Sequence, residues 1–183
     1  MKPNEGVLFC TILLWITNPV KGRNSRNNIF QTELTELNVD ADPEMMIISH
    51  KITNKTFLDA NVTMLQPIAR GNTLFSMLIR IHSGAGDFYQ TLLKYSSEDF
   101  CEHWITASKD PLLRLALGRA RQFTNIKGCP LEAGEYYFRN FTANGIIPVG
   151  IIPDGEYIIN ASLHQKNLAN GKVNISLVVV VIN

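Results

Sequence analysis

The C-terminal segment Lys172–Val181 (KVNISLVVVV) constrains the fold more than any other part of the chain. It contains the glycosylation motif that begins at Asn174, and a glycan must face solvent, so this asparagine fixes the outward face of the segment. The residues then facing inward are all apolar, namely Val173, Ile175, Leu177, Val179 and Val181. One apolar face with a period of two favours a half-buried antiparallel strand over a helix.

Two more segments behave in the same way when their own glycosylation motifs set the phase. With Asn61 outward, Leu58–Met64 places Leu58, Ala60, Val62 and Met64 on one inward face. With Asn160 outward, Glu156–Leu163 places Tyr157, Ile159, Ala161 and Leu163 inward. Three segments therefore give an apolar face under a signal that is independent of hydrophobicity.

Other short segments complete a mostly β chain. Further strands are predicted at Met45–Ile52, Leu74–His82, Phe88–Tyr95 and Tyr136–Phe141, and Asn170-Gly171 is a strong turn signal before the last strand. About seven or more short strands with frequent turns predict an immunoglobulin-like antiparallel β-sandwich.

The phase of Tyr136–Phe141 is less regular than that of the other strands. Asn140 outward leaves Tyr136 and Phe138 on the same side. Either these rings cover a sheet edge, or Asn140 lies past the end of the strand.

One segment, Asp110–Phe123, predicts a single short α-helix. Asp110 is a good N-cap and Pro111 suits the first helical position. On a helical wheel a broad apolar arc contains Leu112, Leu113, Leu115, Ala116, Leu117, Ala120 and Phe123. The helix either covers a cavity or simply packs in the core.

Residues 1–22 have the features of an export signal. Lys2 precedes the apolar run Val7–Ile16, and Val20 and Gly22 are small residues suited to cleavage before Arg23. Ten apolar residues span only about 15 Å as a helix, too short for a bilayer. A retained membrane anchor is the alternative. The expected mature protein is therefore one domain, residues 23–183, that is secreted and not stably inserted in a membrane.

The charge balance gives no reason to expect a polyanionic partner. The chain has 17 basic and 16 acidic residues, and loss of residues 1–22 would remove Lys2, Lys21 and Glu5 and make the two signs equal. A neutral chain has no electrostatic drive toward nucleic acid or an anionic membrane.

Cysteine and asparagine usage agree with export. Cys10 would leave with the signal, so Cys101 and Cys129 remain as the one possible pair, with two free buried thiols as the alternative. A bridge closing this loop would stabilise the fold by roughly 3–4 kcal/mol on the chain-entropy model. Five glycosylation motifs, at Asn54, Asn61, Asn140, Asn160 and Asn174, predict a glycoprotein.

No catalytic, metal-binding or cofactor motif is visible. The chain lacks G-x-S-x-G, H-E-x-x-H, P-loop and dinucleotide-binding signatures, and its four histidines are widely separated. Cys101 and His103 could suggest a nucleophile and a base, but an oxidised cysteine cannot attack a substrate. We therefore expect a protein that is not an enzyme and uses no cofactor.

The C-terminal half resembles the insect relatives of the ML lipid-recognition family, which include chemosensory proteins A and B and are similar to ganglioside activator proteins. The resemblance lies in an ordered set of short motifs over residues 95–183: Asp110-Pro111-Leu112-Leu113, Cys129-Pro130-Leu131, Gly134-Glu135-Tyr136-Tyr137, Pro148 and Pro153-Asp154-Gly155-Glu156-Tyr157. One departure is the disulfide content, because well-known ML proteins carry several bridges and this chain can form one after export.

The resemblance implies a sandwich whose sheets separate to hold an apolar ligand, and a role as carrier, presenter or extracellular co-receptor. The ligand would be a lipid, fatty acid, sterol or pheromone-like molecule, with a cell-surface receptor as a second partner. The expected wall of the cavity is Leu112, Leu113, Ala116, Leu117, Phe123, Tyr157, Ile159, Leu163, Val173, Ile175 and Leu177. The alternative is an interaction protein with a solid core, whose outer-face rings Tyr136 and Phe138 engage a partner.

Overall fold

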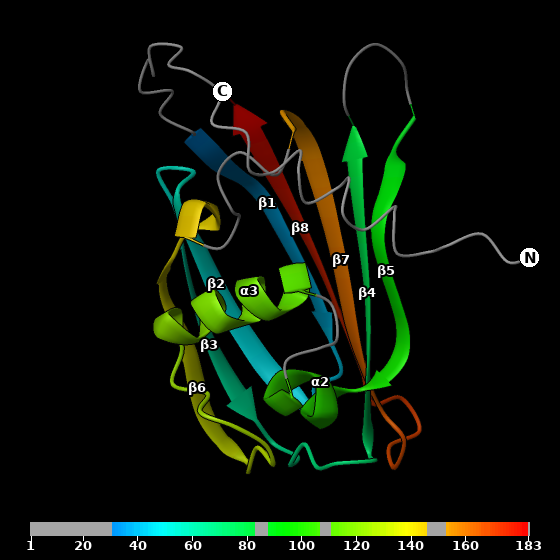
Figure 1. Ribbon diagram of the computed structural model, residues 1–183. Coiled ribbons are helices and arrows are strands. Elements are labelled where there is room, and N and C mark those ends of the chain that lie inside the picture. Colours follow the sequence, from blue (N-terminus) through cyan, green and yellow to red (C-terminus); the bar gives the residue numbers. More distant parts are fainter. Residues whose placement is uncertain (1–30, 83–87, 107–110, 146–152, 183) are drawn as a thin grey trace, which may run out of the picture.

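In the computed structural model, which describes residues 31–82, 88–106, 111–145 and 153–182, eight strands form two antiparallel sheets (Figure 1). The five-stranded sheet has the order β1 (Gln31–Ala41), β8 (Lys172–Ile182), β7 (Gly155–Gln165), β4 (Thr73–His82) and β5 (Gln90–Asp99). The three-stranded sheet has the order β2 (Met46–Thr53), β3 (Phe57–Met64) and β6 (Gly134–Phe141). The predicted β-sandwich is confirmed.

Four short helical segments accompany the strands in the described residues. They are α2 (Phe100–Thr106), α3 (Pro111–Ala120), and the single-turn 3-10 helices η1 (Arg121–Phe123) and η2 (Ala143–Gly145). The predicted helix corresponds to α3 and η1, and its expected N-cap, Asp110, lies outside the described residues. The sequence did not predict α2. No helix in the described part of the chain is long and apolar enough to span a bilayer.

The inward phases set by the glycosylation motifs are confirmed. In β3, Leu58, Ala60 and Met64 are at most 8% exposed, whereas Asn61 between them is exposed. In β8, the five inward residues named from the sequence all belong to, or pack against, the apolar clusters of the interior. Asn160 and Asn174 lie on the opposite face of the five-stranded sheet.

A β-bulge in β6 explains the irregular phase around Asn140. Phe138 pairs with Ala60 and Phe141 pairs with Leu58, so three steps on β6 match two steps on β3. Asn140 takes up the extra residue with a φ of 50°, a conformation that asparagine adopts more readily than most residues. Phe138 and Phe141 therefore share the inner side, and their rings meet edge to face at 6.3 Å.

The sequence did not predict β1, and a second bulge gives the reason. The pairing with β8 shifts between Leu34 and Glu36, so the apolar residues of β1 do not keep a spacing of two. Leu34 and Leu37 both pack in the interior although they are three residues apart. Pattern recognition that requires strict alternation misses such a strand.

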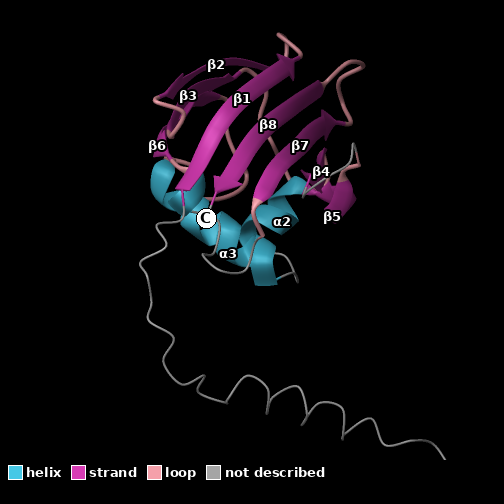
Figure 2. Cartoon of the chain, turned by 90° about the horizontal axis from the view of Figure 1, so that it is seen from above, coloured by secondary structure: helices cyan, strands magenta, loops and turns pink. Residues whose placement is uncertain are grey.

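The two long edges of the sandwich are closed differently. At one edge, the backbone N–H of Leu34 in β1 donates to the carbonyl of Lys55 in the β2–β3 turn at 2.7 Å, and the ammonium group of Lys55 lies 3.6 Å from the Glu33 carboxylate. At the other edge, between β6 and β5, α2 and α3 lie along the side of the molecule (Figures 1 and 2). Main-chain bonding therefore closes the first edge, and helices cover the second.

Candidate functional site: the inner face of the five-stranded sheet

Strand register arranges the inner face of the five-stranded sheet in rows that run across the strands. One row consists of Leu34, Val179, Tyr157 and Ile81, which are neighbours in register on β1, β8, β7 and β4. These side chains are 0%, 1%, 3% and 2% exposed. This end of the inner face is therefore fully packed, and Leu58, Ala143 and Val181 complete its cluster.

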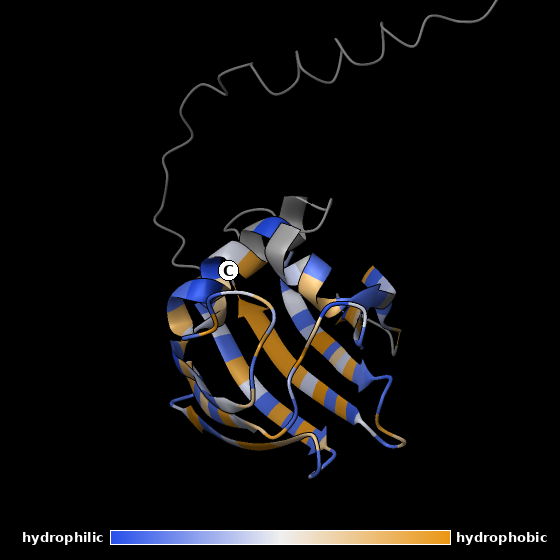
Figure 3. Ribbon diagram, turned by 90° about the horizontal axis from the view of Figure 1, so that it is seen from below, coloured by the Kyte–Doolittle hydropathy of each residue, from blue (hydrophilic) through white to orange (hydrophobic). Residues whose placement is uncertain are grey.

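The next two rows, which we call the middle rows, are apolar but only half-buried. The first is Leu37, Leu177, Ile159, Ile79 and Leu93, and the second is Val39, Ile175, Ala161, Met77 and Tyr95. Each of these side chains keeps an intermediate exposure. In Figure 3 the orange of hydrophobic residues runs along neighbouring strands of this sheet.

Beyond the middle rows the interior is packed again. A second cluster contains Met45, Met64, Ile68, Leu131 and Val173, all at most 5% exposed. In a sandwich with a filled core, the centre of the inner face is its most buried part, since both sheets cover it at close-packed density. Here the order is reversed, because the two ends are buried and the centre retains accessible apolar surface.

The disulfide lies in the second cluster and ties the edges of the two sheets together. Cys101 in α2 is bonded to Cys129, with a Cα–Cα distance of 5.4 Å, so the predicted pairing is confirmed. α2 follows β5, and Cys129 precedes β6 by a few residues. Leu131 exchanges both backbone hydrogen bonds with Ile68, at 2.8 and 2.9 Å. One end of the helix-covered edge is thereby fixed.

A ladder of aromatic rings leads from the inner face to the helices. Phe75 of β4 meets Phe100 of α2 edge to face at 6.3 Å, and Phe100 stacks on Trp104 at 5.8 Å. The guanidinium of Arg121 in η1 lies over the Trp104 ring, 5.7 Å from its centroid, and donates to the Trp104 carbonyl. On the other side, Phe123 of η1 packs on Phe141 of β6 at 5.6 Å. Thus η1 joins the helix at one sheet to the edge of the other.

The structure brings some of the residues predicted to line a cavity into the middle rows and places others elsewhere. Ile159, Ile175 and Leu177 are in the middle rows. Tyr157 and Val173 are fully buried in the two end clusters, and Leu163 packs against the second cluster. Leu117 and Phe123 are half-buried, and the side chains of Leu112, Leu113 and Ala116 lie outside what the structure describes.

Sequence reasoning missed the part of the middle rows that lies on β1, β4 and β5. The missed residues are Leu37, Val39, Met77, Ile79, Leu93 and Tyr95. Their strands carry no glycosylation motif, so no independent signal fixed their inward phase. The alternation of β4, Thr73–His82, was available, but both its faces contain apolar residues.

Tyr157 is the polar residue of the fully buried row, and its hydroxyl has a hydrogen-bond partner. Its hydroxyl donates to the backbone carbonyl of Pro153 at 2.5 Å. Burial, with a smaller contribution from the nearby Asp154 carboxylate, raises the pKa of Tyr157 to about 12. The phenol therefore stays neutral at physiological pH and adds no charge to the interior.

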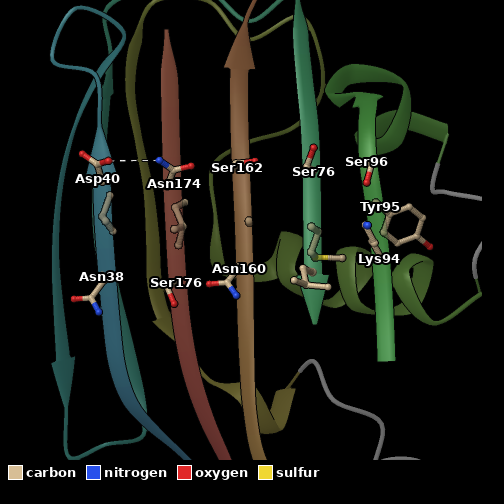
Figure 4. Close-up of a pocket in the computed structure, with 15 residues that line it drawn as sticks. Asn38, Asp40, Ser76, Lys94, Tyr95, Ser96, Asn160, Ser162, Asn174 and Ser176 are labelled. Carbon is tan, nitrogen blue, oxygen red and sulfur yellow. Dashed lines mark hydrogen bonds between the residues drawn. The ribbon is translucent and has the colours of Figure 1, made fainter. Parts of the chain in front are cut away.

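The outer face of the same sheet has an open hollow of about 480 Å³ with a mixed polar and apolar lining (Figure 4). Its polar lining residues include Asn38, Asp40, Asn160, Asn174 and Lys94. Leu78 and the five residues of the second middle row also line it. The amide of Asn174 donates to Asp40 at 3.4 Å. Two predicted glycan acceptors therefore lie in this hollow, in the rows where Asn160 pairs with Ser176 and Asn174 pairs with Ser162.

The outer face of the three-stranded sheet corrects the residues expected to engage a partner. Tyr136 and Phe138 point inward, and Tyr136 packs against the second cluster. The outward residues are Tyr137, which is 40% exposed, and Arg139, whose guanidinium lies 5.1 Å from the Tyr137 ring centroid. The surface argument for a partner that rested on Tyr136 and Phe138 is therefore wrong.

The described residues favour binding over chemistry at the middle rows. Their side chains are aliphatic apart from the thioether of Met77 and the phenol of Tyr95. Such a surface gains free energy by burying apolar groups, about 25 cal/mol per Å². Among the described residues, no group of three His, Cys, Asp or Glu side chains is arranged to hold a metal ion.

Comparison with known proteins gives a partial match to one family model. Residues 74–159, from β4 into β7, match the model of a family described as "Protein of unknown function (DUF1091)". No curated protein matches the chain. Among solved structures, the crystal structure of chicken MD-1 complexed with lipid IVa is similar at a TM-score of 0.30 and 16% identity, over 81% of this chain and 96% of the other. A TM-score this low supports no functional argument.

Proposed function

We propose that the protein binds a small hydrophobic molecule between its two sheets and acts as an extracellular carrier or presenter. The observation that supports this is the reversed burial of the inner face, with half-buried apolar rows between two fully buried ends. A ligand such as a lipid, fatty acid, sterol or pheromone-like molecule would cover the middle rows. Burial of about 300 Å² of apolar surface would contribute about 7 kcal/mol before the costs of ordering the ligand.

The proposal includes secretion and glycosylation. The Cys101–Cys129 bridge fits an oxidising compartment. Asn54, Asn61 and Asn140 are exposed, and Asn160 and Asn174 lie in the outer hollow, so folding buries none of the five acceptors. The export signal expected at residues 1–22 lies outside the described residues. A chemosensory role in an insect follows only from the resemblance to chemosensory proteins.

Identification of bound molecules tests the proposal directly. The glycoprotein would be secreted from an insect cell line and analysed by native mass spectrometry, followed by organic extraction. We expect a co-purifying hydrophobic molecule, and displacement of a fluorescent fatty-acid probe by the extract. A protein that carries nothing and binds neither fatty-acid nor sterol probes would contradict the proposal.

A matched pair of substitutions on β7 locates the binding surface. Ile159→Gln places an amide in the middle rows, and we expect probe affinity to fall about tenfold. His164→Gln changes an exposed residue on the outer face of the same strand and should leave the affinity unchanged. Equal effects of the two substitutions would place the binding site outside the middle rows. That result would favour the alternative, an interaction protein with a solid core.

A further inference from the structure

Residues 111–131, which we call the cationic strip, include α3 and η1 at the helix-covered edge of the sandwich. Residues 111–131 contain Arg114, Arg119, Arg121 and Lys127 and no Asp or Glu. This concentration stands out because the whole chain has a net charge of only +1. Arg114, Arg121 and Lys127 are exposed and Arg119 is half-buried. Within the described part of the chain, none of the four forms an ion pair.

Arg121 connects the strip to the apolar inner face through a chain of ring contacts. The aromatic ladder starts at Phe75, which neighbours Met77 of the middle rows on the inner side of β4, and ends at Arg121 over Trp104. Phe123, two residues after Arg121, contacts β6 of the other sheet. The guanidinium of Arg121 therefore lies at the end of a chain of rings that begins on the inner face.

The polar side-chain groups of Trp104 and Arg121, at the end of this ladder, are all hydrogen-bond donors. Trp104 is 8% exposed, and its indole N–H has no acceptor among the described residues. The guanidinium of Arg121 beside it also carries donors only. A buried donor without a partner costs about 1–3 kcal/mol, so an acceptor brought by a ligand would relieve this cost.

We propose that the ligand is an amphiphile with an anionic head group, such as a long-chain carboxylate. Its apolar tail would lie on the middle rows, and its head group would accept hydrogen bonds from Arg121, Arg119 and the Trp104 indole. Charge-assisted bonds from guanidinium to carboxylate are among the stronger hydrogen bonds in proteins. This inference rests on the proposed function, because it names the class of molecule bound at the same interior.

Trp104 provides the readout. The chain has two tryptophans, Trp15 and Trp104, and only Trp104 lies in residues 23–183. Its fluorescence would be followed at pH 7.4 while the secreted protein is titrated with dodecanoate, dodecanol and methyl dodecanoate. These ligands share an apolar tail and differ in the charge of the head group. We expect dodecanoate to bind at least tenfold more tightly than either neutral ligand, and more weakly as salt is raised.

Four arginine variants test whether the strip causes the preference for dodecanoate over the neutral ligands. Arg121→Gln and Arg119→Gln should each lower dodecanoate affinity about tenfold and leave dodecanol affinity unchanged, while Arg121→Lys should restore part of the preference. Arg139→Gln removes a guanidinium from the outer face of β6 and is the matched control, with no effect expected. Thermal unfolding of each variant is measured first. If loss of the Arg121–Trp104 contact unfolds the protein, Arg119→Gln still tests the role of the strip.

The possible outcomes separate this inference from the proposed function. Equal affinity for dodecanoate and dodecanol, or a preference that survives both glutamine variants, would overturn the anionic head group and leave hydrophobic binding intact. Binding of none of the three ligands would overturn the proposed function itself. Sedimentation with vesicles of anionic phospholipid, without binding of dodecanoate, would show that the strip contacts a membrane surface, and it too would overturn the inference.

Discussion

The two faces of the five-stranded sheet are built from alternate residues of the same strands, and they differ in both polarity and packing. On β8 the inner residues Ile175 and Leu177 lie between Asn174, Ser176 and Val178 of the outer face. The outer face forms an open hollow with many polar side chains, whereas the inner face is apolar and incompletely covered. A polar surface needs no cover, but accessible apolar surface in an interior costs free energy unless something fills it.

A substitution pair on β1 should show the largest difference between the inner and the outer face of the sheet. Leu34→Asp places a carboxylate at a fully buried inner position, and we expect a loss of at least about 3 kcal/mol of unfolding free energy. Asn38→Asp makes the outer face more acidic near Glu36, and its cost should stay below about 1 kcal/mol. Denaturant unfolding measures both. Similar costs would show that the assigned inner and outer phases of β1 are wrong.

Removal of the disulfide should have the next largest effect. The bridge joins residues 28 apart and connects the helix-covered edges of the two sheets. The double variant Cys101→Ser, Cys129→Ser should lose about 2–4 kcal/mol of stability. The melting temperature of the wild-type protein, measured with and without reductant, should fall to match the variant. An unchanged melting temperature would mean that the bridge does not support this edge.

Neighbouring tyrosines on β6 extend the comparison to the smaller sheet. Tyr136 points inward and its hydroxyl donates to the Glu132 carbonyl at 3.0 Å, so Tyr136→Ala should cost about 2–3 kcal/mol. Tyr137 is outward and 40% exposed, with the Arg139 guanidinium over its ring, so Tyr137→Ala should cost less than about 1 kcal/mol. Thermal unfolding of the two variants tests the order. The reverse order would contradict the bulge at Asn140 as the reason for the strand's phase.

The smallest effect on stability is expected for the glycan acceptors of the outer hollow. Asn160→Gln and Asn174→Gln should each remove one glycan, seen as a mass difference that disappears after enzymatic deglycosylation. Stability should change by less than about 0.5 kcal/mol, because both side chains lie on the solvated face. A wild-type protein without glycan at either position would show that this face is not modified.

The parts of the fold that were predictable are those where two sequence signals agree. In β3, β7 and β8, hydrophobic alternation and a glycosylation motif gave the same inward phase, and the structure confirms it. The bulges in β1 and β6 were not predictable, because an extra residue breaks the period of two. The same lack of phase information explains why six of the ten residues of the middle rows were missed. These residues, on β1, β4 and β5, become neighbours only through strand pairing.

α2 was also missed, for a different reason. Phe100–Thr106 (FCEHWIT) is short and rich in residues that favour strands. Its helical form is supported by tertiary contacts, namely the disulfide at Cys101 and the stacking of Phe100 on Trp104. Asp99 also accepts from the backbone N–H of Glu102 at 2.8 Å, which satisfies a free donor of the first turn. Local propensity alone does not contain these contacts.

A pair of enlarging substitutions on β8 tests the central claim most directly. Leu177 lies in the middle rows, and Val179, two residues further on the same face, is 1% exposed. We predict that Leu177→Trp keeps the melting temperature within a few degrees and releases the bound molecule, since the new ring takes the place of the ligand. Val179→Trp should instead lose about 1–3 kcal/mol or more through overpacking. If Leu177→Trp destabilises the protein as much as Val179→Trp and displaces nothing, the interior is solid and the account is wrong.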